Sequence, residues 1–371
     1  MKKVYIQRLL KLVSLVLPII LIVLLLQQYV FVFRDHNKER IQKFYCEDKN
    51  SLDVMILGAS EVITGYAPGY AYGKYGYTSY MYAMDSNIGS LYTAQLKEIL
   101  SYQDPGLILV ETYGFTRFTE DLNSEAKFRY FIEGTPQSQN KLDVFMNFNC
   151  GNKISCLLPF IKYHGDFDIA KQQLQYLRLN RGSTHSPSLL KGIKTWTVMH
   201  SGPGDEGIAD GTNDRICDDA KAYLVEFLEY CQQENLNNVI FVNFPRYIQS
   251  EEQSDVLKRV DDIGKIVTEY GFPFLDLQKE MGVIGLDAPS DFYNAHHLNV
   301  YGQQKLTDYL GDLIINKQNL IPREQSAENM QHWKESAKIT EQFFAFAKKE
   351  IAAGNYVWLE DETDVLSKLK Q

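Results

Sequence analysis

After residue 50, short apolar runs alternate with segments of helical spacing, and this alternation constrains the fold more than any other feature. Strands of a parallel sheet covered on both faces are continuous apolar runs, and helices provide the connections between them. We therefore predict an α/β fold, a three-layer α/β/α sandwich with a parallel sheet. Strands are expected at 53–57, 78–83, 107–110, 238–242 and 273–277, and helices at 90–102, 218–233, 252–270 and 302–315.

The predicted α/β domain covers residues 51–320, with one interruption. About a hundred residues, from roughly 115 to 215, do not follow the alternation, which indicates an insertion with helices near 141–148 and 168–179. A C-terminal helical tail is expected over 321–371, with an amphipathic helix at 324–351.

The N-terminus carries a membrane signal. The 22 residues from Leu12 to Phe33 contain no charge, and this is about the length that a helix needs to cross a bilayer. Bulky residues follow instead of a cleavage pattern of small residues, which favours an uncleaved signal-anchor over 1–33 and not a removed signal peptide. A buried core helix is the alternative. Residues 34–50 are polar and of mixed charge, and we expect them to form a stalk.

The orientation of this anchor does not follow from charge counting. Four basic residues precede the span and four follow it, so the positive-inside rule gives a tie. The short basic head before the span is typical of a signal-anchor start. We therefore expect a single-pass protein of the cell membrane, in contact with membrane lipid through this helix, with its main domain extracytoplasmic.

Composition excludes some partners and cofactors. The formal net charge of −9 argues against nucleic acid, because neutralising phosphates needs clustered lysine and arginine. The five cysteines form no CxxC pair, and the histidines are scattered apart from His296 and His297. No metal site and no organic cofactor is predicted.

A serine is expected at the end of the first strand, in the sequence Gly58-Ala59-Ser60. Ligands of open α/β sheets bind beyond the carboxyl ends of the strands, and the small residues keep the turn tight. Ser60 there is a candidate nucleophile, and its backbone N–H is a candidate donor to an oxyanion. The alternative is a serine that caps the following helix.

The late segment from Asp291 to Gly302 supplies what a serine nucleophile needs. It places His297 in a loop directly before a predicted helix, where Leu298 can anchor the loop and Asn299 can cap the helix. A serine at a strand end and a histidine in such a loop, with parallel α/β order between them, indicate nucleophilic acyl chemistry.

On these two segments the chain resembles the SGNH/GDSL hydrolase superfamily over roughly residues 51–318. It is most similar to membrane-anchored cell-envelope members, such as proteins of D-alanyl-lipoteichoic acid biosynthesis and of alginate O-acetylation. The resemblance implies that Ser60 is the nucleophile and His297 the general base. It places Ala83 where the family has an oxyanion glycine, and Glu111 to Gly114 where the family has an asparagine.

The acid of the expected triad departs from the family pattern. The family has an aspartate three residues before the histidine, and this chain has Asn294. An asparagine can orient an imidazole but does not stabilise imidazolium by charge. We predict Asp291, six residues before His297, as the orienting acid, with Asn294 as the alternative. His296 is expected to line the site or to face solvent.

Two further residues follow the end of the third predicted strand. Glu111 and Arg117 are predicted to border the pocket and bind substrate, and an arginine there would suit an anionic polymer. A surface ion pair is the alternative for Arg117.

The predicted function is acyl transfer or ester hydrolysis on an extracytoplasmic glycan or cell-wall polymer, through an acyl-serine intermediate. The resemblance also implies a multi-spanning membrane acyltransferase as a possible partner. The rival prediction is a catalytically inactive envelope protein that binds polysaccharide or scaffolds such an acyltransferase, its acid having been lost at position 294.

Overall fold

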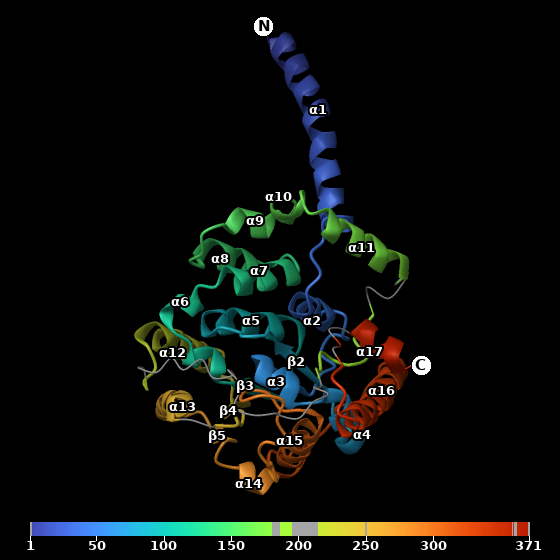
Figure 1. Ribbon diagram of the computed structural model, residues 1–371. Coiled ribbons are helices and arrows are strands. Elements are labelled where there is room, and N and C mark those ends of the chain that lie inside the picture. Colours follow the sequence, from blue (N-terminus) through green and yellow to red (C-terminus); the bar gives the residue numbers. More distant parts are fainter. Residues whose placement is uncertain are drawn as a thin grey trace.

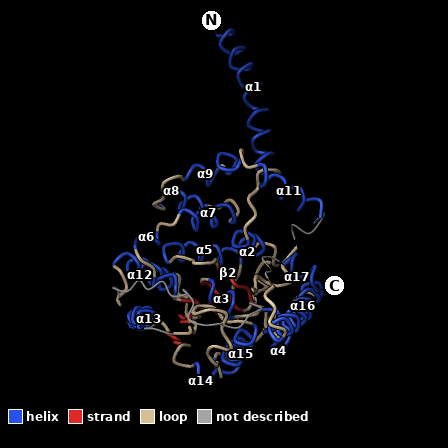
Figure 2. Tube along the Cα trace, in the orientation of Figure 1, coloured by secondary structure: helices blue, strands red, loops and turns tan. Residues whose placement is uncertain are grey.

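The computed structural model describes residues 2–179, 186–194, 214–248, 251–357, 359 and 362–369. Its centre is one sheet of five parallel strands in the order β2-β1-β3-β4-β5. Figure 2 shows the strands in red, surrounded by helices. The strands are β1 Val54–Gly58, β2 Ser79–Ala83, β3 Leu107–Glu111, β4 Val239–Asn243 and β5 Phe274–Asp276.

The five strands lie where the apolar runs predicted them, and the α/β class is confirmed. Every residue of the first four strands is buried, as continuous apolar runs require. Successive side chains point to opposite faces of a strand. In β1, Met55 and Leu57 therefore join one hydrophobic core, and Val54 and Ile56 join another on the opposite face.

Helices cover both faces of the sheet. The first core includes side chains of α5 (Tyr92–Tyr102), α12 (Asp218–Gln233) and α13 (Glu251–Glu269). The second includes side chains of α3 (Ser60–Gly65), α4 (Pro68–Tyr75), α15 (Val300–Asp312) and α16 (Ala327–Ala352). The predicted helices at 90–102, 218–233, 252–270 and 302–315 correspond to α5, α12, α13 and α15.

Residues 119–179 of the insertion form mostly short helices that lie between the sheet domain and the N-terminal helix (Figure 1), and residues 186–194 contain no helix. The predicted helices near 141–148 and 168–179 correspond to α8 and α11, and residues 195–213 lie outside the described ranges. The helices are α6 Thr119–Leu122, α7 Glu125–Gly134, α8 Gln139–Asn147, α9 Lys153–Leu157, α10 Pro159–Tyr163 and α11 Phe167–Leu179.

The N-terminal helix, α1 (Lys2–Tyr29), projects away from the body of the protein (Figure 1). Its stretch Val4–Tyr29 is long and apolar enough to cross a membrane, with a mean hydropathy of 3.0 and 0% of that window buried. A core helix of a soluble domain would be mostly buried, so the exposure of α1 argues against that alternative.

Residues 34–50 do not form the expected stalk. They contain α2 (His36–Phe44), whose start is capped by Asp35 accepting a hydrogen bond from the Asn37 N–H. Ile41 and Phe44 are buried in the first core. The segment looked like a stalk because much of its buried surface is polar. Arg40, for example, is buried and donates to the Gly192 and Ala83 carbonyls.

The C-terminal tail is partly built into the domain. The predicted helix at 324–351 corresponds to α16, which packs along α4, and its Trp333, Phe343 and Phe344 are buried. Short elements complete the chain: η1 Gly89–Leu91, η2 Tyr113–Thr116, α14 Met281–Ile284, the π-helical η3 Leu313–Lys317 and α17 Glu362–Leu369.

Candidate active site

Ser60 lies at the first position of α3, directly after β1. In the strand order 2-1-3-4-5, the connections from β1 and β3 lead to opposite sides of the sheet, so the topological switch point lies between the carboxyl ends of these two strands. Ser60 follows one of these strands, and Glu111 ends the other. Ser60 is partly exposed, while its neighbours Ala59 and Glu61 are buried. The topology thus presents the serine hydroxyl at the place where ligands of such sheets bind.

Glu111 fixes the turn that carries Ser60. Its carboxylate accepts from the Ala59 N–H at 3.2 Å and from the Tyr113 N–H at 2.6 Å. Gly58 is needed for this approach, because a Cβ at that position would lie 2.7 Å from the Cβ of Glu111. Glu111 has no exposed surface, and its contact with a substrate stays a prediction. Its role in the structure is to hold the backbone before the serine.

The loop between β5 and α15 brings His297 to Ser60. An antiparallel bridge pairs Phe292 with Leu298, and the Tyr293 N–H donates to the His297 carbonyl at 2.8 Å. The turn that this pairing closes directs the imidazole toward α3. Nε2 of His297 lies 2.8 Å from Oγ of Ser60, a hydrogen-bonding distance between residues 237 positions apart in sequence.

The contacts of Asn294 fix the tautomer of His297. Its Oδ1 accepts from the backbone N–H groups of His296 and His297, both at 3.0 Å. These two groups can only donate, so the atom that they face is the amide oxygen. The same Oδ1 lies 2.8 Å from Nδ1 of His297, which must therefore carry its proton. Nε2 is then unprotonated and accepts from the Ser60 hydroxyl, which is the arrangement of a nucleophile and its base.

Asp291 does not orient His297, which corrects the sequence prediction. Its buried carboxylate accepts from the Asp287 N–H at 2.6 Å and from Nζ of Lys305 at 2.7 Å. Asp291 precedes the residues paired by the bridge, and Asn294 lies inside the loop that the bridge closes. Asn294, the alternative third member, therefore makes the orienting contact, and Asp291 anchors the base of the loop.

Glu61 is a buried carboxylate beside the serine, and the sequence analysis did not identify it. Its Oε2 lies 3.4 Å from Oγ of Ser60, and its Oε1 lies 3.2 Å from Nη2 of Arg246. Glu61 and Arg246 are almost inaccessible, with exposed fractions of 3% and 1%. Since the single hydroxyl proton of Ser60 points to His297, Glu61 acts on this site as a nearby negative charge.

The pKa directions of the site follow from burial and from this charge. Burial raises the pKa of Glu61, but Arg246 and then His297 oppose it and leave that pKa below its usual value. Burial, reinforced by the charge of Glu61, raises the pKa of Glu111 to about 8. Burial also lowers the pKa of His297, although Glu61 acts in the opposite direction. The site therefore holds a neutral histidine at neutral pH, next to one ionised carboxylate.

Two arginine side chains of this region lie over the ring of Tyr113. The guanidinium groups of Arg246 and Arg117 each lie 4.4 Å from the centre of its ring. Arg117 also lies 4.0 Å from a carboxylate oxygen of Asp121, which is a weak ion pair. His296 is partly buried, with its ring centre 6.4 Å from that of Tyr113. His296 therefore lies beside the region of His297. Arg117 is linked to that region through its contact with the Tyr113 ring.

Ala83 lies at the end of β2, paired in register with Gly58. It has no exposed surface, and its carbonyl accepts from Arg40. A better placed donor is the Ser60 N–H, because first-turn N–H groups of a helix have no partner within the helix. The assignment of Ala83 to an oxyanion stays a prediction.

Sequence patterns pointed to Ser60, His297 and Asn294, but not to Glu61 or Arg246. Glu61 looks like an ordinary acidic residue in the first turn of a helix, where carboxylates are common. Arg246 follows β4 in the sequence Asn243-Phe-Pro-Arg246, and its position after a central strand was the one available signal. Within the described ranges, no group of three histidine, cysteine, aspartate or glutamate side chains could hold a metal ion.

No protein-family model matches the sequence, and no curated protein matches it at a significant level.

Proposed function

We propose that this chain is a membrane-anchored serine esterase or O-acyltransferase of the SGNH type, acting through an acyl-serine intermediate. The observation that carries the proposal is the continuous contact from Ser60 through His297 to Asn294, with both distances at 2.8 Å. Those three residues come from the end of β1 and from the loop before α15. Helices on both faces of a parallel sheet agree with the three-layer arrangement of that superfamily.

In the proposed reaction, Oγ of Ser60 attacks the ester carbonyl while Nε2 of His297 takes the hydroxyl proton. The imidazolium then returns this proton to the leaving alkoxide, and an acyl-Ser60 ester remains. In the second half, an acceptor hydroxyl or water attacks that ester, and His297 takes its proton. The bond between the acyl carbon and Oγ of Ser60 then breaks, and the imidazolium returns the proton to Oγ. The Ser60 N–H, at the start of α3, is the donor that we assign to the oxyanion of both steps.

Glu61 supplies the negative charge that the usual aspartate would supply. Asn294 holds the tautomer of His297 but has no charge to offer the imidazolium. The carboxylate of Glu61 is ionised, adjacent to Ser60 and close enough to His297 to oppose the lowering of the His297 pKa by burial. In a buried site such a charge stabilises the imidazolium formed in the transition state. This is the argument against the rival proposal, in which the loss of the aspartate makes the chain a non-catalytic envelope protein.

The substrate that we propose is an acylated glycan or cell-wall polymer outside the cytoplasm. This part rests on the resemblance in sequence and on α1, which is long and apolar enough to anchor the domain at a membrane. By the same resemblance, a multi-spanning membrane acyltransferase is the proposed partner, and it would deliver the acyl group to Ser60.

The test of this function is hydrolysis of p-nitrophenyl acetate by the full chain in detergent. We expect measurable turnover that is abolished in Ser60→Ala and in His297→Gln. Ser101→Ala, at an exposed serine in the last turn of α5, is the matched control and should leave turnover unchanged. Equal rates for wild type and Ser60→Ala would support the non-catalytic rival for this class of ester.

The proposed orientation has its own test, because the charge count around α1 is balanced. Alkaline phosphatase fused to the C-terminus folds only outside the cytoplasm, so we expect the fusion to be active. An inactive fusion with an active cytosolic reporter at the same position would place the domain inside.

A further inference from the structure

Exposed apolar side chains are concentrated in one part of the described surface. Apart from α1, twelve large hydrophobic side chains of the described residues are exposed, and eight of them lie between residues 142 and 174. The rest of the surface thus has few of them, and a concentration of this kind marks an interaction site. The eight are Leu142, Met146, Ile154, Leu157, Leu158, Ile161, Phe167 and Leu174. We call their surface, on α8 to α11, the insertion surface.

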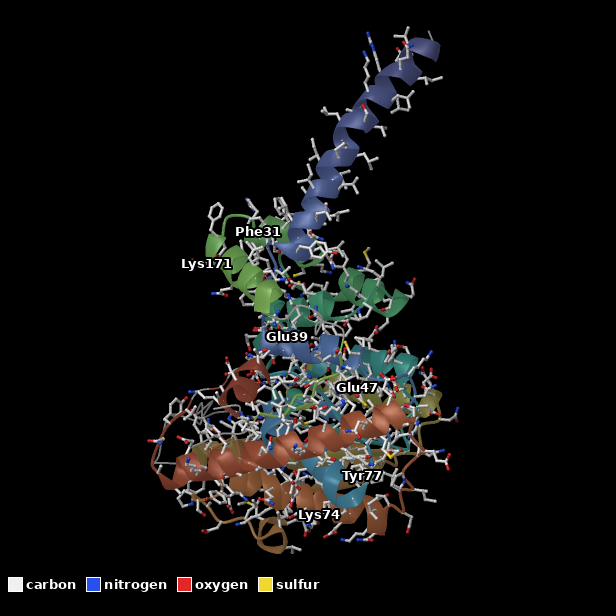
Figure 3. The ribbon with its side chains drawn as sticks, turned by 90° about the vertical axis from the view of Figure 1, so that its right-hand side faces the viewer. Phe31, Glu39, Glu47, Lys74, Tyr77 and Lys171 are labelled. Atoms are coloured by element: carbon white, nitrogen blue, oxygen red, sulfur yellow. The ribbon has the colours of Figure 1, made fainter. Side chains whose placement is uncertain are left out.

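The insertion surface adjoins the point where α1 meets the body of the protein. Phe31 and Phe33 follow α1, and their rings contact Phe160 and Tyr163 of α10 at centroid distances of 5.7 Å and 5.5 Å. Ala170 of α11 belongs to the same small cluster. Figure 3 shows Phe31 and Lys171 near each other, beside the lower end of α1. The insertion helices therefore lie where a spanning α1 would leave the bilayer.

The insertion helices are fixed to the domain and to one another. Asn140 of α8 donates to the Ala94 carbonyl and to the Glu98 carboxylate of α5, at 2.9 Å and 2.7 Å. Arg129 of α7 donates to the Ser155 carbonyl and hydroxyl of α9 at 2.9 Å and 2.8 Å, and its guanidinium is nearly buried. Arg129 also pairs with Glu133, 3.0 Å away. The exposed apolar groups are thus held in place and are not free to fold back into a core.

The pattern along α11 is that of a helix lying at an interface. Phe167, Lys171 and Leu174 follow a spacing that puts them on one face, and all three are exposed. Ala170 and Gln173, next to this face around the helix, are buried. Lysine at the edge of an apolar face can keep its charge in the headgroup region while its stem contacts apolar material.

From these contacts we infer that the insertion surface, on α8 to α11, lies against the lipid bilayer beside α1 and holds the domain close to the membrane. Lipid fits this surface because the surface continues the apolar surface of α1 and carries lysine at its edge. The inference rests on the proposed anchoring by α1 and adds a second membrane contact to it. It would fix the height and tilt of the domain, which a single flexible tether does not.

The test is site-directed spin labelling of the full chain in lipid nanodiscs. The partly exposed Cys46, Cys150 and Cys217 are replaced by alanine, and the buried Cys156 and Cys231 are kept. One nitroxide is attached at a time, in Ile161→Cys or Phe167→Cys on the insertion surface. Val283→Cys, at an exposed apolar position in α14 at the opposite end of the molecule, is the matched control (Figure 1). Leu21→Cys in α1 reports the span itself.

Collision with oxygen, which enters lipid, is compared with collision with a water-soluble nickel complex. At positions 161 and 167 we expect the ratio of oxygen to nickel collisions to be several-fold higher than at 283 and lower than at 21, because an interfacial surface lies less deep than the span. A ratio at 161 and 167 equal to that at 283, with position 21 in lipid, overturns the inference and leaves the anchor intact. A water-exposed label at position 21 overturns both. Protection from both reagents at 161 and 167 would mean that protein covers the surface, and it would also overturn the inference.

Discussion

At the scale of single residues, the central question is how a histidine oriented by an asparagine can act as a strong base. Asn294 accepts three hydrogen bonds through one oxygen and so leaves His297 a single tautomer. The charge comes from Glu61, which follows the nucleophile directly in sequence. Orientation and charge, which one aspartate combines in the familiar triad, are thus divided between two residues.

The charge of Glu61 is tested by Glu61→Gln. Removing this negative charge disfavours imidazolium, so the pKa of His297, already below 6.5 through burial, should fall further. Activity needs neutral His297, so the acid limb of the pH–rate profile should move to lower pH. The plateau of kcat should fall by roughly tenfold to a hundredfold, because the transition state loses its counter-charge. An unchanged pH profile would contradict this role.

Glu61→Gln also leaves Arg246 without its partner, so a loss of folding must be separated from a loss of catalysis. The double variant Glu61→Gln/Arg246→Met removes both charges. If it restores thermal stability but not kcat, the charge of Glu61 itself is what catalysis requires.

The orienting residue is tested by Asn294→Asp. Aspartate keeps an acceptor for the same three donors and adds a charge next to Nδ1 of His297. In a serine triad the reverse exchange costs about 10⁴ in turnover. Because Glu61 already supplies a charge here, we expect a smaller gain in kcat/KM, about tenfold. The acid limb should move to higher pH. Asn294→Ala is the control and should lose activity, and a gain there would refute the orienting role.

At the scale of elements, α2 connects the membrane helix to the domain through buried polar contacts. Directly after it, Glu47 pairs with Lys191, with oxygen–nitrogen distances of 2.7 Å and 2.8 Å and no exposed side chain on either partner. The Nζ of Lys191 also lies 4.1 Å from the centre of a Trp333 ring. The beginning of the domain, the end of the insertion and α16 therefore meet at one ion pair.

Lys191→Met tests this junction, because it leaves a buried carboxylate without a partner. We expect the free energy of unfolding to fall by about 3–5 kcal/mol, measured by chemical denaturation in detergent. Lys74→Met, which breaks the surface pair with Asp308, is the matched control and should cost less than about 1 kcal/mol. The double variant Glu47→Leu/Lys191→Met should recover most of the loss. Equal losses of unfolding free energy in Lys74→Met and Lys191→Met would show that the buried ion pair stabilises the fold no more than the surface pair does.

The same elements show what sequence could and could not predict. The strands were predictable because β1 and β3 are buried on both faces and therefore apolar throughout. Helix α2 was not, because Asn37 and Arg40 on its buried side are polar and have partners far away in sequence. Ser60 and His297 were found from their places before helices. Their contact with each other depends on the sheet order, which the sequence pattern alone does not determine.

At the scale of the whole molecule, the predicted orienting residue was wrong because the loop pairing decides which side chain reaches His297. Asp291 was chosen for its charge, but the bridge between Phe292 and Leu298 leaves it outside the turn. Glu61 was not predicted because the partner that keeps its buried carboxylate ionised is Arg246, 185 residues away. These relations arise only when β1, β4 and the last loop are assembled at the carboxyl ends of the strands.

The most direct test of the account is the trapping of an acyl group on the full chain. The protein is incubated with an activated acetyl ester, quenched in acid and analysed by intact and peptide mass spectrometry. We predict one acetyl group on Ser60 in the wild type and none in Ser60→Ala. We predict more adduct in the wild type than in His297→Gln at short times. An unmodified Ser60 in the wild type, or the same adduct in Ser60→Ala, would contradict the assignment of Ser60 as the nucleophile.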